Sequence, residues 1–421
     1  MNKSIIRRLT IHGMLFQAIF WFGFCTYMAF MVTTLIDYGW SASAATGAIT
    51  AMSVIIMLVQ PVYGYISDKY LSEKKLSVVL LVLTVVFLLL MPLSLDSGNK
   101  LLVLLNMIGI TVTGTQVGGL MDSWIVGLKQ EFISINYGLI RGTGSLAFAL
   151  SAQITGAVTI AFGHSIRFWL GGGFLILAVF VALTFRSARS SGQTNEKEHS
   201  SSQFSGVEAF KLIFSSKQYR LLLSVSFFLL LSNAAMTTLL QLLIRDYGGT
   251  TAQIGTASAI MAGSEVPLMF LMAYIMKKTG QKKLLVFSSM VYVIRMFITA
   301  SAFTVNGLIY VQLLQGLTYA VLLPVSMSYL SQIVDERVRS TTVTTYTAIT
   351  ASLTGILGNF ITSTLLSAGF SAQNALIVFA FSALVGFILA LYGSVRRIWD
   401  IDHADKNAES KKDYTLEGGK I

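Results

Sequence analysis

Four charged side chains interrupt long apolar stretches of this sequence, and they are the groups best suited to do chemistry. They are Asp122, Arg141, Glu265 and Arg295. A charge inside a membrane-spanning helix costs at least about 2.5–3.5 kcal/mol, so a chain that keeps one has a use for it. Arginine offers a planar fork of donors for two oxygen atoms, and a carboxylate can accept hydroxyl groups or take up a proton.

The four residues form two acid–base pairs at matching depths. Glu265 and Arg295 each lie twelve residues from the lysines of the turn that separates their apolar runs. Asp122 lies seven residues before Lys129, and Arg141 lies seven residues after Ser134. Two interpretations stay open: the pairs only hold neighbouring helices together, or they line a polar cavity that binds a solute and a proton. We favour the cavity, because a cheaper polar residue than arginine would suffice for packing.

Other residues near these charges extend the candidate site. Phe148 lies two helical turns after Arg141 and could stack on the apolar side of a sugar ring or on an aromatic solute. Pro267 follows Glu265 by two residues and frees a backbone carbonyl, which predicts either a fixed kink or a bend that helps the cavity to open and close. Neutral polar groups in the second half of the chain add hydrogen-bonding capacity: Asn233, Gln241, Gln312 and Gln315.

The elements that must position these residues are membrane-spanning helices. The chain has 421 residues, of which 54% are hydrophobic and only 12% charged, about half the charge of a soluble domain. A membrane-spanning helix needs about 20 apolar residues. Twelve such runs are present, at 11–36, 43–67, 75–94, 100–127, 135–162, 166–185, 219–244, 251–276, 283–303, 307–332, 340–368 and 373–395. The predicted fold class is an all-α membrane protein.

A repeated turn divides the twelve runs into two sets of six. The segment GYISDKYLSEKKL (residues 64–76) has a fainter copy, AYIMKKTGQKKL (residues 273–284), about 210 residues later. A repeat half the chain long predicts two copies of one helical unit. We therefore expect two six-helix bundles at 1–185 and 219–397, a polar Ser-rich linker at 186–218 and a solvated tail at 398–421.

The distribution of charge gives an orientation and excludes several function classes. Basic residues cluster before the first run and in alternate turns, which places both chain ends in the cytoplasm. The net charge of +11 is spread over these turns and forms no single basic face, so nucleic acid is not an expected partner. The sequence contains no nucleotide-binding loop, metal motif or nucleophile motif. We expect no enzyme activity, no cofactor and no metal.

Several motifs resemble those of a known family. The turn at residues 64–76 resembles the signature between the second and third helices of the major facilitator superfamily. The segments LVQPVYGYISDK, MDSWI, YGLIRGTGSLAF and GSEVPLMF are similar to its oligosaccharide:proton symporter branch, the lactose-permease-like transporters. The resemblance implies the major facilitator fold, an inward-facing cavity between two pseudo-symmetric six-helix bundles, proton-coupled uptake and alternating access.

The resemblance also implies roles for individual residues. Those implied for substrate binding are Asp122, Arg141 and Phe148, with Asn233 and Gln315 at positions where the family carries charged or titratable side chains. Those implied for proton coupling are Glu265, Arg295 and Asp122. Gating residues would be Gly64, Asp68, Lys74 and Pro267. Gln315 and Thr318 replace the family's histidine and glutamate, and Asn233 and Gln312 replace a charge pair, so proton coupling would rest on Glu265 or Asp122.

The leading hypothesis is a proton-coupled importer of a sugar, oligosaccharide or glycoside, acting as a monomer in the lipid bilayer of the bacterial inner membrane. A symporter of nucleosides or aromatic acids, or an exporter of amphipathic compounds, is a second hypothesis within transport. A membrane sensor built on a transporter fold is a third, and the short linker and tail leave no room for the soluble output domain that it would need.

Overall fold

The described part of the chain is built almost wholly from helices. The computed structural model describes residues 3–131, 137–185, 211, 213–334 and 339–400. The first half contains α1 (Lys3–Met28), α2 (Met31–Asp37), α3 (Ala42–Lys69), α4 (Glu73–Asp96), α5 (Lys100–Glu131), α6 (Tyr137–Phe162) and α7 (Ile166–Thr184). The second half contains α9 (Lys217–Asp246), α10 (Thr251–Thr279), α11 (Gln281–Ala300), α12 (Val305–Val311), η3 (Gln312–Leu314), α13 (Gln315–Ile333), α14 (Arg339–Thr347), η5 (Ala348–Leu353), α15 (Thr354–Ser367) and α16 (Ala372–Val395).

These helices make twelve membrane spans, which confirms the predicted fold class. Within the described ranges, 12 helical stretches are long and apolar enough to cross a membrane. Three spans are composite: α1 with α2, α12 with η3 and α13, and α14 with η5 and α15. Many large apolar side chains on the outside remain exposed, as expected of helices that face lipid instead of water.

The first span is broken where the sequence predicts a continuous helix over 11–36. The chain leaves the helix after Met28 and resumes at Met31. The carbonyl of Phe30 accepts the hydroxyl groups of Thr33 at 2.9 Å and Thr34 at 2.8 Å, and the Arg167 guanidinium lies 3.4 Å away. Hydroxyl groups that bond to backbone carbonyls compete with the helical hydrogen bonds and bend the helix. The break contains no glycine or proline, so sequence inspection does not reveal it.

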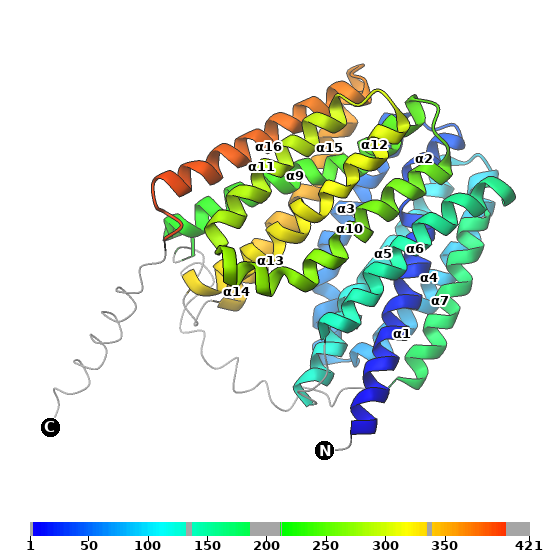
Figure 1. The fold of residues 1–421 in the computed structure, drawn as a ribbon. Helices are drawn as coiled ribbons and strands as arrows, with labels where there is room; N and C mark the ends of the chain where they lie inside the picture. The colour runs from blue at the N-terminus through cyan, green and yellow to red at the C-terminus, as the bar shows by residue number, and fades with distance from the viewer. Residues whose placement is uncertain (1–2, 132–136, 186–210, 212, 335–338, 401–421) are drawn as a thin grey trace.

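The two sets of spans lie against each other at a tilt. Figure 1 shows α1 begin at the bottom of the view and α16 end at its left edge, and we call this side of the molecule, where both helices have their chain ends, the terminal end. The helices of the two halves approach most closely at the opposite, upper end, which we call the closed end. There α6 packs on α10 and α3 packs on α15. Glycine allows this approach: a Cβ added to Gly255 would lie 2.3 Å from the carbonyl oxygen of Ala152.

Polar contacts also join the halves at the closed end. Asp37, the last residue of α2, forms an ion pair with Arg245 near the end of α9. The Ser363 hydroxyl of α15 donates to the Ser43 carbonyl of α3 over 2.8 Å. These contacts hold the closed end together across the two halves.

At the terminal end, by contrast, the polar contacts described here stay inside one half. Lys74 of α4 donates to the Phe185 carbonyl over 2.7 Å, and Lys282 of α11 pairs with Asp400 at 2.9 Å. The predicted linker at 186–218 and the predicted tail at 398–421 fall mostly outside the described residues. The predicted domain boundaries stay a prediction.

Candidate functional site: a cavity between the two halves

A cavity of about 430 Å³ lies between the halves, on the terminal side of the closed end. Its size is in the range of small-molecule sites. Its walls come from α1, α2, α3 and α6 on one side and from α9, α10 and α15 on the other. The polar side chains of the wall are Arg141, Ser145, Thr237, Thr238, Gln241, Ser258, Glu265 and Asn359, and its aromatic side chains are Trp21, Phe24 and Phe148.

On the first-half side, a chain of polar contacts positions Arg141. Its Nε lies 3.7 Å from Oδ2 of Asp122, as the matched depths predict. Gln17 of α1 donates to Oδ1 of Asp122 over 2.8 Å and accepts the indole N–H of Trp21, also at 2.8 Å. The guanidinium of Arg141 lies over the Trp21 ring, 4.8 Å from its centroid, which adds a cation–π attraction. The first acid–base pair is therefore one member of a four-residue network.

Two glycines make room for the Trp21 indole. A Cβ added to Gly144 of α6 would lie 2.5 Å from the ring, and one added to Gly118 of α5 would lie 3.3 Å from it. Phe148 meets Trp21 edge to face, with ring centroids 6.5 Å apart. The aromatic wall of the cavity is thus centred on Trp21, a residue that neither charge nor spacing in the sequence marks.

On the second-half side, Arg295 is buried in a shell of neutral groups. It is 1% exposed. Its guanidinium donates to Asn233 at 3.2 Å, to Gln312 at 2.7 Å and to Gln315. Three carboxamide oxygens therefore solvate the charge in place of a carboxylate.

The second acid–base pair does not form directly, contrary to the expectation from matched depths. Gln315 lies between the two charges: its Nε2 donates to Oε1 of Glu265 over 2.7 Å, and its Oε1 accepts from Arg295. Counting residues gives the depth of Glu265 and Arg295 in the membrane but not their side-to-side placement. It therefore does not show that a residue of α13 fills the space between α10 and α11. Glu265 itself lines the cavity.

The structure sorts the predicted substrate-binding and coupling residues into two layers. Arg141, Phe148 and Glu265 line the cavity. Behind them, Asp122 contacts Arg141, while Asn233, Gln315 and Arg295 form the network that reaches the cavity through Glu265. All the predicted residues of this set therefore belong to one connected region, although only part of them faces the solute space.

The predicted gating residues lie elsewhere. Lys74 donates to the carbonyls of Leu183 and Phe185 at 2.8 and 2.7 Å and so holds the end of α7 within the first half. Gly64 is exposed, with open space where a Cβ would lie. The Asp68 side chain lies outside the described residues. Pro267 is within α10, two residues beyond Glu265.

Several wall residues carry no signal of charge or motif in the sequence. They are Trp21, Thr238 and Asn359, and the hydroxyl of Thr238 donates to Asn359 over 2.8 Å. Gln17, which contacts Trp21 from outside the wall, was not selected either. Polar residues at i and i+4 on an apolar helix, such as Gln17 and Trp21 or Thr237 and Gln241, were the only available hint. Within the described ranges, no group of three or more His, Cys, Asp or Glu side chains lies together as a metal site requires.

A match to a protein-family model shows which family this chain belongs to. The model of the MFS_1 like family matches residues 6–381. The chain belongs to the MFS_1 like family. It is a multi-pass membrane transporter of small molecules and not an enzyme, and the resemblance seen in its motifs is confirmed.

Similar proteins are transporters as well. The chain is 25% identical to the maltose permease of Geobacillus stearothermophilus over 340 residues, which cover 80% of this chain and 82% of that protein. It is 29% identical to the lactose permease of Klebsiella oxytoca over 164 residues, covering 37% of this chain and 38% of the relative. The solved structure of the nucleoside transporter NupG has the same fold, with a TM-score of 0.74, 13% identity and coverage of 94% and 100%.

Proposed function

We propose that this protein is a secondary transporter that couples the uptake of a saccharide, such as an oligosaccharide or glycoside, to protons. One observation carries the proposal: a guanidinium, a carboxylate and an aromatic wall face one cavity between two halves that are joined at one end. A sugar presents hydroxyl groups around an apolar ring face, and this wall offers partners for both. The maltose and lactose permeases among its relatives support the same substrate class.

In the proposed mechanism Arg141 binds substrate hydroxyls and Glu265 carries the proton. Glu265 borders the cavity, and its described hydrogen bond comes from the neutral Gln315. A carboxylate without a direct guanidinium partner can be neutralised by a proton, and Gln315 passes the change on to Arg295. We assign Asp122 to substrate binding through Arg141, and Asn233 and Gln315 to positioning.

Alternating access follows from the contacts between the halves. The closed end must open and the terminal end must close for the solute to cross, and glycine contacts between α6 and α10 are broken and remade in this motion. We propose the cytoplasm of a bacterial cell for both termini, so the cavity of this conformation faces inward. Transport by a monomer in the inner membrane, with two bundles at 1–185 and 219–397, belongs to the same proposal.

Nucleoside transport is the second candidate. The neutral amides and hydroxyls of α9, α10 and α15 suit a base and a ribose as well as a sugar, and the nucleoside transporter NupG shares the fold. The carboxylate at Glu265 and the guanidinium at Arg141 fit either solute.

Uptake into proteoliposomes tests the proposal. Labelled maltose, glucose and uridine are offered under an imposed proton gradient, to wild type and to Arg141→Ala and Glu265→Gln. Arg141→Ala should abolish saccharide uptake. Glu265→Gln should lose accumulation driven by the gradient and keep exchange of labelled for unlabelled solute, because its side chain stays neutral.

The matched control Asp96→Asn changes an exposed acid and should behave as wild type. Accumulation by Glu265→Gln at the wild-type level would contradict the coupling assignment, and uptake of uridine alone would contradict the substrate class.

A further inference from the structure

A second cavity, also of about 430 Å³, lies between the two halves at the closed end. It shares no lining residue with the cavity that holds Arg141 and Glu265. Its first-half wall is the start of α3, from Ser41 to Ser43, and its second-half wall comes from the ends of α9 and α15 and the turn into α16. We call it the closed-end pocket. A solute bound there contacts both halves of the molecule.

Asp246 is the one charged residue among those that line the closed-end pocket. It is exposed, and its carboxylate makes no ion pair or hydrogen bond within the described part of the chain. Arg245, its neighbour in the chain, is paired with Asp37 instead. Asp246 is also the last residue of α9, where an acid lies at the negative end of the helix dipole and is unfavourable. Its carboxylate is therefore available to a cation from outside the chain.

The rest of the closed-end pocket combines apolar side chains with serine hydroxyls. Leu366 and Phe370 lie in its wall, and Phe370 is 44% exposed. The hydroxyl oxygens of Ser41 and Ser371 each accept a backbone N–H of the helix that they begin, at 3.1 and 3.2 Å. These caps satisfy amides that would otherwise attract an anion to the starts of α3 and α16. One carboxylate beside an apolar and aromatic wall suits a cation that carries an apolar tail.

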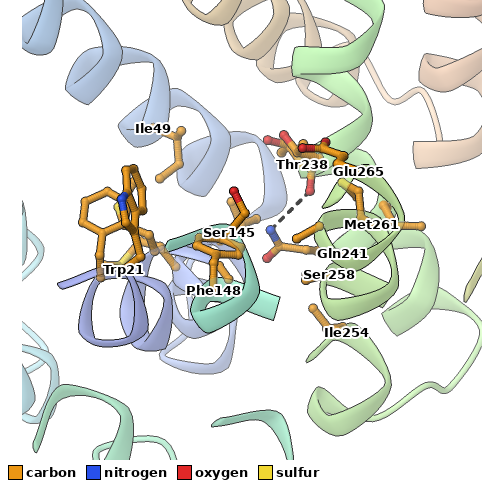
Figure 2. A pocket seen from close by; sticks show the side chains of 18 of the residues that line it. Trp21, Ile49, Ser145, Phe148, Thr238, Gln241, Ile254, Ser258, Met261 and Glu265 are labelled. Atoms are coloured by element: carbon orange, nitrogen blue, oxygen red, sulfur yellow. Dashed lines mark hydrogen bonds between the residues drawn. The ribbon is translucent and has the colours of Figure 1, made fainter. Parts of the chain in front are cut away.

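Neither a metal ion at this pocket nor a cation in the central cavity fits the structure as well. Calcium takes about six to eight oxygen ligands, and no group of three or more His, Cys, Asp or Glu lies together within the described ranges. Glu265 is a carboxylate in the cavity drawn in Figure 2. Arg141 lines that cavity too, and its positive charge repels a cation.

We propose that the closed-end pocket binds an organic ammonium ion, a primary amine with an apolar or aromatic tail. The ammonium group donates to the Asp246 carboxylate, and the tail packs on Phe370. Opening of the closed end moves the start of α3 away from Asp246 and divides the pocket, so the bound amine stabilises the conformation in which this end is closed. An amine on the closed side is therefore an inhibitor of the transport cycle, whichever solute the protein carries.

Calorimetric titration of the purified full-length protein with phenethylamine tests the site, and phenylethanol serves as a neutral analogue of the same shape. Asp246→Asn keeps the shape of the side chain and removes its charge. It should weaken phenethylamine binding about 3- to 10-fold, between the contribution of an exposed ion pair and that of a hydrogen bond to a charged group. Wild type should bind phenylethanol more weakly than phenethylamine by a similar factor. Asp96→Asn, at an exposed acid that ends α4 outside the pocket, is the matched control and should bind as wild type does.

A second pair of variants tests the dependence on closure. A Cβ added to Gly255 would lie 2.3 Å from the Ala152 carbonyl oxygen, so Gly255→Val forces α10 away from α6 at the closed end. It should weaken phenethylamine binding although Gly255 does not line the pocket. Gly263 of the same helix has open space where a Cβ would lie, and Gly263→Val should leave the affinity unchanged.

Three outcomes would overturn the proposal. Equal binding of phenethylamine and phenylethanol, or unchanged binding in Asp246→Asn, would show that the carboxylate does not recognise the ammonium group. Loss of binding in Glu265→Gln with none in Asp246→Asn would place the amine in the central cavity. Unchanged affinity in Gly255→Val would mean that the site does not depend on contact between the halves, and inhibition by stabilising closure would be refuted.

Discussion

Arg295 shows how a buried charge is kept without an acid beside it. Asn233, Gln312 and Gln315 all turn a carboxamide oxygen toward it. Amide dipoles solvate a guanidinium but do not neutralise its positive charge. Glu265, which accepts a hydrogen bond from Gln315, is the acid that balances the charge of Arg295. A change in the charge of Glu265 therefore alters the electrostatic energy of Arg295, although the two side chains are not in direct contact.

Replacement of Arg295 by lysine should destabilise the protein in spite of the conserved charge. A single ammonium group cannot reach amides that the guanidinium contacts from both of its terminal nitrogens, and each buried amide left unpaired costs about 1–3 kcal/mol. We expect a lower midpoint of thermal unfolding for Arg295→Lys in detergent and a greater decrease for Arg295→Met. The exposed Arg396→Lys serves as control. Equal midpoints for Arg295→Lys and wild type would contradict the role of the fork.

Trp21 is expected to act on substrate through Arg141. Trp21→Phe keeps an aromatic ring but removes the hydrogen bond to Gln17 and weakens the cation–π contact, terms that together are worth about 1–2 kcal/mol. Substrate affinity measured by calorimetry should fall about 5- to 30-fold. Trp169→Phe, at a tryptophan that is 52% exposed on α7, is the matched control and should have no effect. A loss as great in the control would show a general effect of removing indole.

At the scale of elements, α6 and α10 are the pair whose contact is set by glycine. Gly156 of α6 would place a Cβ 2.9 Å from Cα of Ala252, and Gly255 of α10 would place one 2.3 Å from the Ala152 carbonyl. These are contacts to backbone, which cannot rotate away as a side chain can. The closeness of the two helices therefore depends on the absence of two side chains.

Gly255→Val should separate the halves at the closed end. The added side chain cannot fit against α6, so the conformation with that end open becomes favoured. The reporter is a cysteine at Ile244, a buried residue of the cavity wall, in a chain whose native Cys25 is replaced by alanine. Labelling by a membrane-impermeant maleimide from the closed side should accelerate.

The control for this experiment lies on the same helix. Gly263 has open space where a Cβ would lie, so Gly263→Val should leave the rate of labelling unchanged. Acceleration by both substitutions would mean that valine perturbs α10 in general, and the close approach of α6 would not be the cause.

At the scale of the whole molecule, one charged cluster holds the closed end across the two halves. Asp37 pairs with Arg245, and Nδ1 of His164 lies 3.2 Å from Asp37 and 2.6 Å from the Arg167 guanidinium. A guanidinium can only donate, so Nδ1 accepts from Arg167 and carries no proton in this arrangement. Tyr38 packs its ring edge to face on the same imidazole.

The cluster lowers the pKa of His164. Burial is the main cause; the charges of Arg167 and Arg245 add to it, and Asp37 partly opposes it. When the halves separate, the imidazole loses the charge of Arg245 and part of its burial, so its pKa rises toward the ordinary value of about 6.5. The open state then binds the proton better than the closed state, so closure is most stable above about pH 6.5 and weakens as the pH falls below it.

Acidification on the closed side should therefore favour opening. Only the thiolate reacts with maleimide, so the rate at position 244 is divided at each pH by the rate for a free thiol. This normalised rate should be higher at pH 5 than at pH 7.5, by a few-fold at most, because partly exposed ion pairs contribute only about 0.2–1 kcal/mol. His164→Gln should remove the dependence on pH, and Asp37→Asn should accelerate labelling at both values. An unchanged pH response in His164→Gln would assign the effect to another group.

The sequence alone determined the architecture and the chemistry available. Twelve apolar runs, two related turns and four intramembrane charges predict the spans, the two-fold plan and the pairing of Asp122 with Arg141, because hydrophobic length and charge cost act locally along the chain. The break at Phe30, the 3₁₀ turn within the tenth span and the π-helical turn within the eleventh span were not predicted, since none of these segments contains a glycine or proline that would mark it.

Only the tertiary structure decided which side chains of different helices are in contact. Depth in the membrane follows from residue counts, whereas lateral position depends on how helices distant in sequence rotate and pack. That is why Gln315 lies between Glu265 and Arg295, why the Arg141 guanidinium lies over the Trp21 ring, and why Oε1 of Gln241 has no hydrogen-bond partner in the described part of the chain.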